Sequence, residues 1–199
     1  MKRFIFAVLA PAALLAGCAT PAYVSPVEVT RFTGAQPNLL GSGTIAVRPA
    51  PGVEPDSWDY TAFQTAVSEE LRQLGYTVTG DAGGQVAEVR VQRFVSHRGG
   101  GRSPVNVGVG GSTGSYGSGV GLGVGINLGG GSRPSEQIDT ELHVMIRPSA
   151  GGDALWEGRA RFSATANSDY ADRTAAAARL ADALFSGFPG RSGETIEVR

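Results

Sequence analysis

Three segments of this chain alternate apolar and polar residues with a period of two, and this alternation constrains the fold more than any other feature. The segments are 85–95, 138–147 and 154–164. Successive residues of a β-strand point to opposite faces of a sheet, so each segment is predicted to form a strand with one buried and one solvated face. The apolar faces comprise Ala87, Val89, Val91, Val95, Leu142, Val144, Ile146, Trp156, Ala160 and Phe162.

The turn at 148–152 predicts how two of these strands pair. A short connection between consecutive strands is typical of an antiparallel hairpin. The length of the turn favours Ile146 opposite Trp156. That register sets two pairs opposite each other on the solvated face, Glu141 with Arg161 and His143 with Arg159.

Two helices are predicted from apolar residues at helical spacing. The first follows a proline-rich loop at 49–55, with Asp56 as its expected N-cap and Gly75 as its C-terminal stop. The second spans about 170–186, with Asp169 as its expected N-cap. The expected buried stripes are Tyr60, Phe63, Val67, Leu71 and Leu74 in the first helix, and Ala177, Leu180, Ala181 and Leu184 in the second.

Four further short strands are predicted, at 27–32, 44–48, 76–79 and 194–198. Because the first helix joins two of them, part of the sheet is expected to be parallel. The predicted fold class is therefore α+β, a two-layer α/β arrangement in which a mostly antiparallel sheet carries two amphipathic helices on one face. We assign 27–199 to a single domain with a long Gly-rich hairpin or loop insertion at 99–131.

The insertion at 99–131 holds 15 of the 30 glycines. Aliphatic residues alternate with Gly or Asn in 105–110 and 120–128, which predicts strands. Three interpretations stay open: a low-complexity loop, an ordered hairpin that extends the sheet, and an arm that contacts the membrane or a partner protein. The third draws on five arginines with no acidic residue among them, namely Arg90, Arg93, Arg98, Arg102 and Arg133.

The N-terminal segment predicts export from the cytoplasm. Lys2 and Arg3 precede an apolar run at 4–14, which is too short to span a bilayer as a helix and has the layout of a secretory signal peptide. The run leads into four residues that match the bacterial lipobox at every position, Leu15, Ala16, Gly17 and Cys18. The resemblance implies that signal peptidase recognises the first three of these residues and cuts before the cysteine.

This resemblance implies that 1–17 is a signal peptide and that Cys18 is the lipid attachment site. A cysteine sulfur is the nucleophile able to take a thioether-linked diacylglycerol, and two or three acyl chains anchor a protein stably. Residues 18–26 then form a lipidated tether. Lipoproteins that are retained in the inner membrane often carry Asp directly after the cysteine, where this chain has Ala19. By resemblance, Ala19 therefore implies the outer membrane of a two-membrane bacterium, with the domain facing the periplasm. The alternative is an ordinary signal peptide that ends near a cysteine.

Composition and spacing predict no cofactor and no metal site. A single cysteine excludes an internal disulfide, and no His or Cys spacing suits zinc. A formal charge of −1 predicts no nucleic-acid partner. The Gly-x-Gly repeats within 108–125 lack a following helix and Lys2 is the only lysine, so no nucleotide is expected. We interpret Trp58 and Trp156 as core or core-edge aromatics rather than as sugar platforms.

No grouping of residues predicts catalysis. His97 and His143 are the only histidines, and both are expected to be ordinary polar residues of strands. Asp139 and Glu141 share a strand face, where we expect a solvated charge ladder with the arginines of the facing strand rather than a catalytic carboxylate pair. The chain is therefore predicted not to be an enzyme.

Several short motifs follow one another in order along the mature chain. They are Phe63-x-x-Ala66-Val67, Leu71-x-x-Leu74-Gly75-Tyr76, the strand at 87–95, the Gly-rich segment, Leu155-Trp156-Glu157-Gly158-Arg159-Ala160 and Phe188-Pro189. Together they resemble the bacterial lipoproteins grouped as domain-of-unknown-function family 4136. Gly190 stands where members usually carry a second proline. The resemblance implies a cell-envelope lipoprotein and carries no known catalytic residues.

These features predict a non-enzymatic lipoprotein, anchored in the outer membrane through Cys18, that acts as a binding or scaffolding module. The expected partners are the membrane, through the acyl chains, and an envelope protein, through the Gly-rich segment and the adjoining sheet edge, where strand addition is available. One alternative is an accessory subunit of an envelope transport or assembly complex. An alternative of another class is a hydrolase of envelope polymers, which needs a polar cleft that the sequence does not display.

Overall fold

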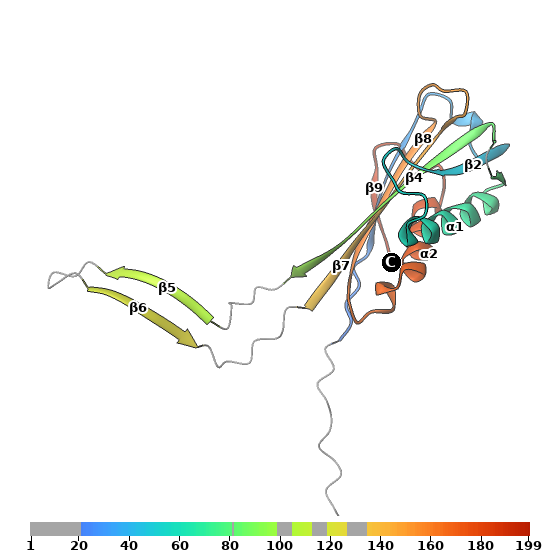
Figure 1. Cartoon of the computed structure of the whole chain (residues 1–199). Helices are drawn as coiled ribbons and strands as arrows, with labels where there is room; N and C mark the ends of the chain where they lie inside the picture. The colour runs from blue at the N-terminus through green and yellow to red at the C-terminus, as the bar shows by residue number, and fades with distance from the viewer. Residues whose placement is uncertain (1–20, 81, 99–104, 113–118, 127–134) are drawn as a thin grey trace, which may run out of the picture.

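The computed structural model describes residues 21–80, 82–98, 105–112, 119–126 and 135–199. Seven strands form one sheet in the order β3-β2-β4-β7-β8-β1-β9, and two helices lie side by side against one of its faces (Figure 1). The bounds are β1 Val27–Thr33, β2 Thr44–Pro49, α1 Trp58–Gln73, β3 Thr77–Thr79, β4 Gln85–Arg98, β7 Ser135–Pro148, β8 Trp156–Thr165, α2 Arg173–Phe185 and β9 Thr195–Val198. Short 3-10 turns occupy Pro37–Leu39 and Asp169–Ala171.

The predicted fold class is confirmed. Strand β2 runs parallel to β3 and β4, and every other neighbouring pair in the sheet is antiparallel. The unit β2–α1–β3 supplies the parallel part, as expected of a strand–helix–strand connection. The predicted register is also confirmed, because Ile146 lies opposite Trp156, Glu141 opposite Arg161 and His143 opposite Arg159.

The core lies between the sheet and the two helices. Residues of both predicted helical stripes, from Phe63 to Leu184, are fully or almost fully buried there, and Leu74 at the end of α1 is partly buried. Trp156 on β8 is fully buried and stacks on Phe185 of α2 with ring centroids 5.4 Å apart. Small residues along α2 allow its backbone to approach the sheet closely, which explains why an alanine-rich helix can cover this face.

Both predicted N-caps are wrong by a few residues. Ser57, not Asp56, caps α1, and its hydroxyl accepts a hydrogen bond from the Tyr60 amide at 3.2 Å. Asp172, not Asp169, caps α2, because Asp169 starts a separate 3-10 turn. In each case two side chains of capping type lie close together in the sequence, and only the path of the chain into the helix decides which one reaches the free amides.

A buried arginine closes the other end of α2. The Arg31 guanidinium on β1 donates to the carbonyl oxygens of Leu184 at 3.0 Å, Ala183 at 2.9 Å and Ser186 at 2.8 Å. These carbonyls carry the negative end of the helix dipole, so the cation stabilises them. Gly190 lies against the same side chain: its φ is +76°, and a Cβ there would lie 2.7 Å from the Arg31 Cδ. This conformation is closed to proline, whose φ is held near −65°.

Within the Gly-rich insertion, β5 (Val105–Ser112) and β6 (Gly119–Ile126) pair antiparallel, with Val105 opposite Ile126. They form a two-stranded sheet of their own rather than part of the seven-stranded sheet. Whether the insertion acts as an arm that contacts the membrane or a partner protein depends on side chains outside the described part of the structure.

Candidate functional site

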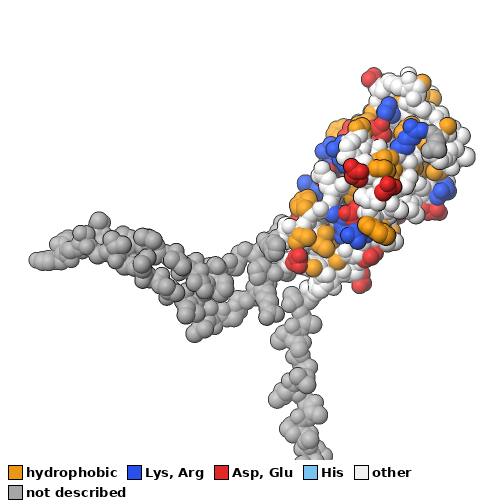
Figure 2. Space-filling view, viewed as in Figure 1, with side chains coloured by type: hydrophobic (Ala, Val, Ile, Leu, Met, Phe, Trp, Pro, Cys, Tyr) orange, Lys and Arg blue, Asp and Glu red, His pale blue; other side chains and the backbone are white. Residues whose placement is uncertain are grey.

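The helices cover only one face of the sheet, and the other face carries the largest group of charged side chains. We call the helix-free side of β4, β7, β8 and β1 the open face. Three adjoining hollows lie along it, with volumes of about 450, 400 and 540 Å³. Acidic and basic side chains are interspersed over the visible surface of the domain (Figure 2). The hollows of the open face are also lined by residues of both signs, among them Glu28, Glu141 and Arg161, so this face carries a mixed charge pattern rather than a field of one sign.

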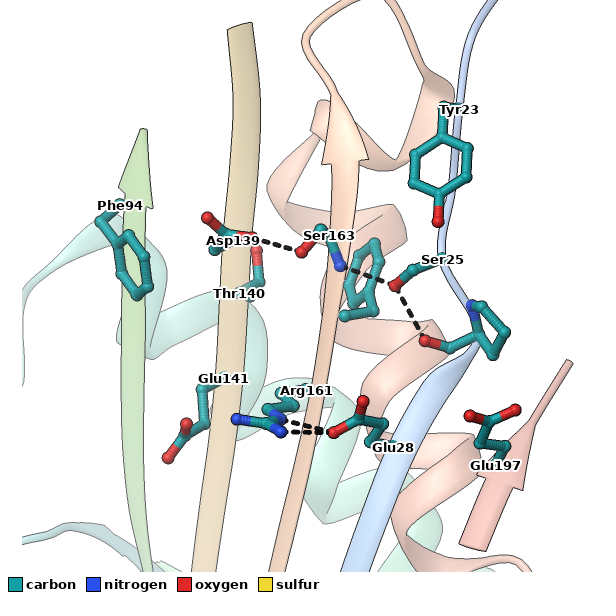
Figure 3. A pocket seen from close by; sticks show the side chains of 12 residues that line it. Tyr23, Ser25, Glu28, Phe94, Asp139, Thr140, Glu141, Arg161, Ser163 and Glu197 are labelled. Carbon is teal, nitrogen blue, oxygen red and sulfur yellow. Dashed lines mark hydrogen bonds and ion pairs between the residues drawn. The ribbon is translucent and has the colours of Figure 1, made fainter. Parts of the chain in front are cut away.

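Arg161 on β8 shows how the charges of the open face pair. Its Cα lies opposite that of Glu141 on β7, as predicted. Its guanidinium, however, turns to the other neighbouring strand and donates twice to Glu28 Oε2 on β1, at 2.7 Å from Nε and 2.5 Å from Nη2 (Figure 3). The expected ladder between Glu141 and Arg161 is therefore wrong, because β1 brings a second carboxylate that the arginine can bind through two nitrogens.

His143 also binds a residue other than its opposite neighbour. Its Nε2 lies 2.8 Å from Glu157 Oε1, and Arg159 Nη2 approaches the same oxygen at 3.4 Å. On the other side of β7, Arg147 forms an ion pair with Glu88 of β4. Three arginines of the open face, Arg147, Arg159 and Arg161, thus lie beside carboxylates, and His143 shares the carboxylate of Glu157.

Asp139 departs furthest from the predicted ladder. It contacts no arginine in the described structure and instead accepts hydrogen bonds from two hydroxyls, Ser96 Oγ on β4 at 2.5 Å and Ser163 Oγ on β8 (Figure 3). No histidine joins this group among the residues whose side chains are described. The carboxylate and the two hydroxyls form a polar link across β4, β7 and β8.

Glu141 occupies the centre of the open face. It lines all three hollows, the only residue among the described lining residues to do so. No hydrogen bond or ion pair reaches its carboxylate within the described part of the chain, since Arg161 and His143 both turn to other acids. A partly exposed carboxylate at the meeting point of three hollows is available to a cationic group from outside.

Two exposed phenylalanines border this polar surface. Phe32 on β1 is 52% exposed and lines one hollow, while Phe94 on β4 is 56% exposed and lines another. Trp58, predicted to lie in or beside the core, is 82% exposed at the first turn of α1, so that prediction is wrong. Its position precedes the buried stripe of the helix, whereas Trp156 is fully buried as predicted.

The chain before β1 is bound to the sheet. The Tyr23 amide donates to Thr165 Oγ1 at 2.9 Å, and the Ser25 amide donates to the Ser163 carbonyl at 2.9 Å. Val24 forms an antiparallel bridge with Ala164. Positions 23–25 of the predicted tether therefore continue the line of β1 along β8.

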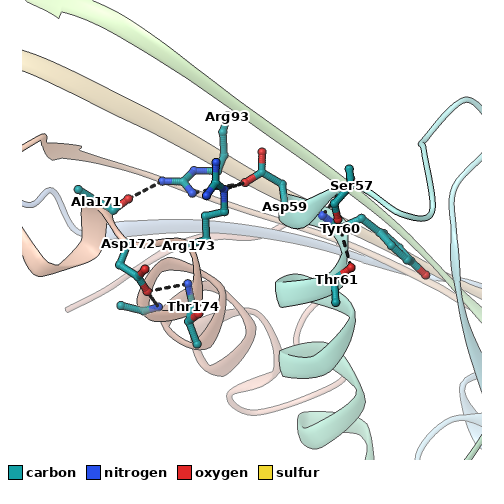
Figure 4. A network of polar contacts seen from close by, with 10 residues as sticks. Ser57, Asp59, Tyr60, Thr61, Arg93, Ala171, Asp172, Arg173 and Thr174 are labelled. Atoms are coloured by element: carbon teal, nitrogen blue, oxygen red, sulfur yellow. Dashed lines mark hydrogen bonds and ion pairs between the residues drawn. The ribbon is translucent and has the colours of Figure 1, made fainter.

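A second polar network joins the N-terminal ends of the helices to β4 (Figure 4). Asp59 accepts from Arg173 Nε at 2.6 Å and lies 3.5 Å from Arg93 Nη1, while Arg93 Nη2 donates to the Ala171 carbonyl at 2.8 Å. Hydrogen bonds from backbone amides, that of Ala175 first, hold the pKa of Asp172 below its ordinary value. This network fixes the positions of both helices relative to the sheet.

The predicted lipidation residues Leu15, Ala16, Gly17 and Cys18 lie outside the described residues, as does the side chain of His97. Across the residues that are described, no cluster of three metal-ligating side chains occurs. Nor does any described helix have the length and apolar character needed to cross a bilayer. The residues of the open face that sequence reasoning did not single out are Glu28, which pairs with Arg161, and the exposed Phe32 and Phe94. The one sequence signal for Phe32 and Phe94 is their place in the alternation of β1 and β4, since each occupies a position on the polar side of its strand, where a side chain is expected to be exposed.

Comparison with known proteins adds no function. No protein-family model matches the chain. An uncharacterized protein of Zymomonas mobilis subsp. mobilis is 27% identical over 217 residues, which cover 87% of this chain and 80% of that protein. A PelC dodecamer from Paraburkholderia phytofirmans aligns at 12% identity and a TM-score of 0.46, over 83% of this chain and 99% of that one. A PDZ domain protein from Parabacteroides distasonis aligns at 13% identity and a TM-score of 0.47, over 88% of this chain and 38% of that one.

Proposed function

We propose that this protein is a lipoprotein of the bacterial outer membrane, anchored through Cys18, that binds another envelope protein and has no enzymatic activity. The observation that carries the binding role is the open face, where the carboxylate of Glu141 lies at the meeting point of three hollows and has no partner among the described residues. The lipobox match at 15–18 supports the anchor. The family resemblance supports the cell envelope as the location.

The chemistry of the open face favours a protein partner. Protein interfaces combine aromatic and arginine anchors with polar groups around them. The open face offers Phe32 and two exposed arginines, Arg159 and Arg161, around Glu141. The hollows adjoin one another through shared lining residues such as Glu141, which suits an extended surface contact more than an enclosed small molecule. A basic side chain of the partner would pair with Glu141.

Site-specific photo-crosslinking tests this proposal. A photoreactive residue is placed at Gln92 on the open face or at Gln73 on the outer side of α1; both glutamines are exposed. In membranes of the native host, we expect one discrete crosslinked protein from position 92 and none from position 73. The same partner captured equally from both positions, or no partner from position 92, would contradict the assignment of the open face.

The charge of Glu141 is tested by a matched pair of variants. Glu141→Gln keeps the size of the side chain and removes its charge. We expect it to lower the affinity for the captured partner about tenfold, which equals about 1.4 kcal/mol of binding free energy. Glu54→Gln removes an exposed charge from the loop before α1 and should leave binding unchanged. Equal affinities of the two variants would count against Glu141 as the contact.

The alternative of an accessory subunit in a transport or assembly complex uses the same face. It is favoured if the crosslinked protein is an integral membrane protein recovered in a fixed ratio from detergent-solubilised membranes. Turnover of an envelope polymer by the purified chain would replace the binding role with the hydrolase alternative.

A further inference from the structure

Four exposed apolar side chains gather at one end of the domain. Tyr23 is 48% exposed, Trp58 82%, Phe94 56% and Val95 52%. We call these four residues the apolar rim. They are four of the six large apolar side chains that are exposed in the described structure. Single exposed apolar residues are ordinary on protein surfaces, whereas a group of them marks an interaction site.

The members of the apolar rim are neighbours in space. Tyr23 and Phe94 line the same hollow of the open face, in which they lie toward the same end of the strands (Figure 3). Phe94 and Val95 line a second hollow, of about 380 Å³, together with Asp59. Trp58 directly precedes Asp59, whose carboxylate lies 3.5 Å from the guanidinium of the neighbouring Arg93 (Figure 4). The rim thus passes from the N-terminal segment across β4 to the start of α1.

The tether places this end of the domain close to the lipid anchor. Tyr23 is hydrogen-bonded to Thr165, so the chain is held to the sheet from that residue onward. Only positions 19–22 lie between it and Cys18. Five residue steps of extended chain span at most about 18 Å. Phe94 is three strands away from Tyr23, a distance of about 10–15 Å at the ordinary strand spacing.

We infer that the apolar rim lies in the interfacial layer of the membrane that holds the acyl chains of Cys18. This inference rests on the lipid anchor of the proposed function and adds a second contact with the same bilayer. Tryptophan and tyrosine prefer this layer because their rings are apolar and their polar atoms stay hydrated. With Tyr23 tethered this closely, the rim reaches the lipid surface without any extension of the domain. The contact orients the domain and turns the far end of the open face, with Phe32, into the periplasm.

The two tryptophans make the inference measurable. Trp58 is 82% exposed, whereas Trp156 is fully buried in the core. The lipidated full chain is reconstituted into vesicles of phosphatidylethanolamine and phosphatidylglycerol, with or without brominated acyl chains that quench tryptophan. We expect bromine to quench about half of the Trp58 emission and to leave Trp156 unaffected. In Trp58→Phe, which keeps only Trp156, the quenching should disappear.

Matched variants separate the rim from other exposed apolar residues. Phe94→Ser and Val95→Ser remove rim members and should together reduce the quenching of Trp58 at least twofold. Phe32→Ser removes a phenylalanine of similar exposure that lies six residues further along the sheet, and it should leave the quenching unchanged. Circular dichroism checks that each variant keeps its fold.

The outcomes distinguish the rim from the anchor. If the wild-type chain floats with the vesicles and Trp58 stays unquenched, the inference is wrong while the lipid anchor stands. If Cys18→Ser floats as well as the wild-type chain, lipid attachment at this residue is not the anchor. If the wild-type chain does not float at all, both the anchor and the rim contact are refuted.

Discussion

Gly158 in β8 lies under the largest side chain of the core, so adding one methyl group there should destabilise the fold. A Cβ at this position would lie 2.2 Å from Trp156 Cη2 and 2.8 Å from Leu184 Cδ1. The Trp156 ring is not free to move away, because it stacks on Phe185 and its Nε1 donates to the Pro189 carbonyl at 2.9 Å. Gly158→Ala therefore forces a shift of the ring or of the strand.

The expected magnitude follows from two opposing effects. Overpacking of a well-packed core costs about 1–3 kcal/mol, and the fixed ring places this site toward the upper end of that range. Alanine also restricts the unfolded chain, which returns about 0.4–1 kcal/mol. We expect a net loss of about 2 kcal/mol in the free energy of unfolding. Gly80→Ala is the matched control, because no heavy atom lies within 4 Å of its Cβ position, and it should change stability by less than about 0.5 kcal/mol.

Urea denaturation followed by circular dichroism measures both variants. With a slope of about 1–3 kcal/mol per molar urea, the midpoint of Gly158→Ala should fall by about 1 M. The double variant with Trp156→Phe tests the cause, since phenylalanine lacks the ring edge that the new Cβ would meet. The two changes should then be less than additive, by at least about 1 kcal/mol. Strictly additive effects of the two changes on the free energy of unfolding, or an unchanged midpoint for Gly158→Ala, would refute the steric argument.

Three further changes test the electrostatics of the helices. Burial raises the pKa of Tyr60 to about 12, and its hydroxyl has no hydrogen-bond partner in the described structure. Because Tyr60→Phe removes this buried, unsatisfied hydroxyl, it should raise the free energy of unfolding by about 1 kcal/mol in urea titrations. Partial burial, and then the charge of Asp182, raise the pKa of Glu70 above its ordinary 4.5. Glu70→Gln should therefore raise the thermal midpoint at pH 7, and this gain should vanish below pH 4.5, where Glu70 is protonated in both the folded and the unfolded chain. The pKa of Asp172 is lowered from its ordinary 3.8, so the capping hydrogen bonds of its carboxylate stabilise the fold fully above pH 3.8, and this stabilisation is lost as the pH falls through the pKa of the folded state. Asp172→Ala should therefore lower the thermal midpoint at pH 7 and have little effect near pH 2. A pH-independent difference in either of the last two cases would contradict the charge-based explanation.

The open face and the apolar rim divide the surface of the domain between two neighbours. The rim lies at the end where the tether joins β8, and Phe32 lies at the other end of the open face. Membrane contact at one end would leave Glu141, Arg159 and the far hollows accessible from the periplasm. The two proposals are therefore compatible, and the two experiments address different parts of the domain: the fluorescence experiment reports on Trp58 at the start of α1, and the crosslinking experiment on Gln92 of the open face.

The sequence by itself determined the local elements of this protein. Alternation in 85–95, 138–147 and 154–164 depends only on residues two positions apart, and the helical stripes depend on residues three and four apart, so neither needs knowledge of the rest of the fold. The hairpin register of β7 and β8 followed from one short turn, and the structure confirms it. The lipobox at Cys18 is likewise a local motif, and it predicts attachment without any tertiary information.

Only the tertiary structure decided which side chains meet. Strand β1 lies beside β8 although more than a hundred residues separate them. This neighbour draws Arg161 to Glu28 and leaves Glu141 without a partner in the part of the chain that the structure describes. The same long-range order buries Arg31 under the end of α2, where its guanidinium binds carbonyl oxygens of the helix. Exposure of Trp58 also depends on where α1 begins relative to the sheet. Ion pairing and exposure are set by which distant segments pack together, and local spacing carries no information about that choice.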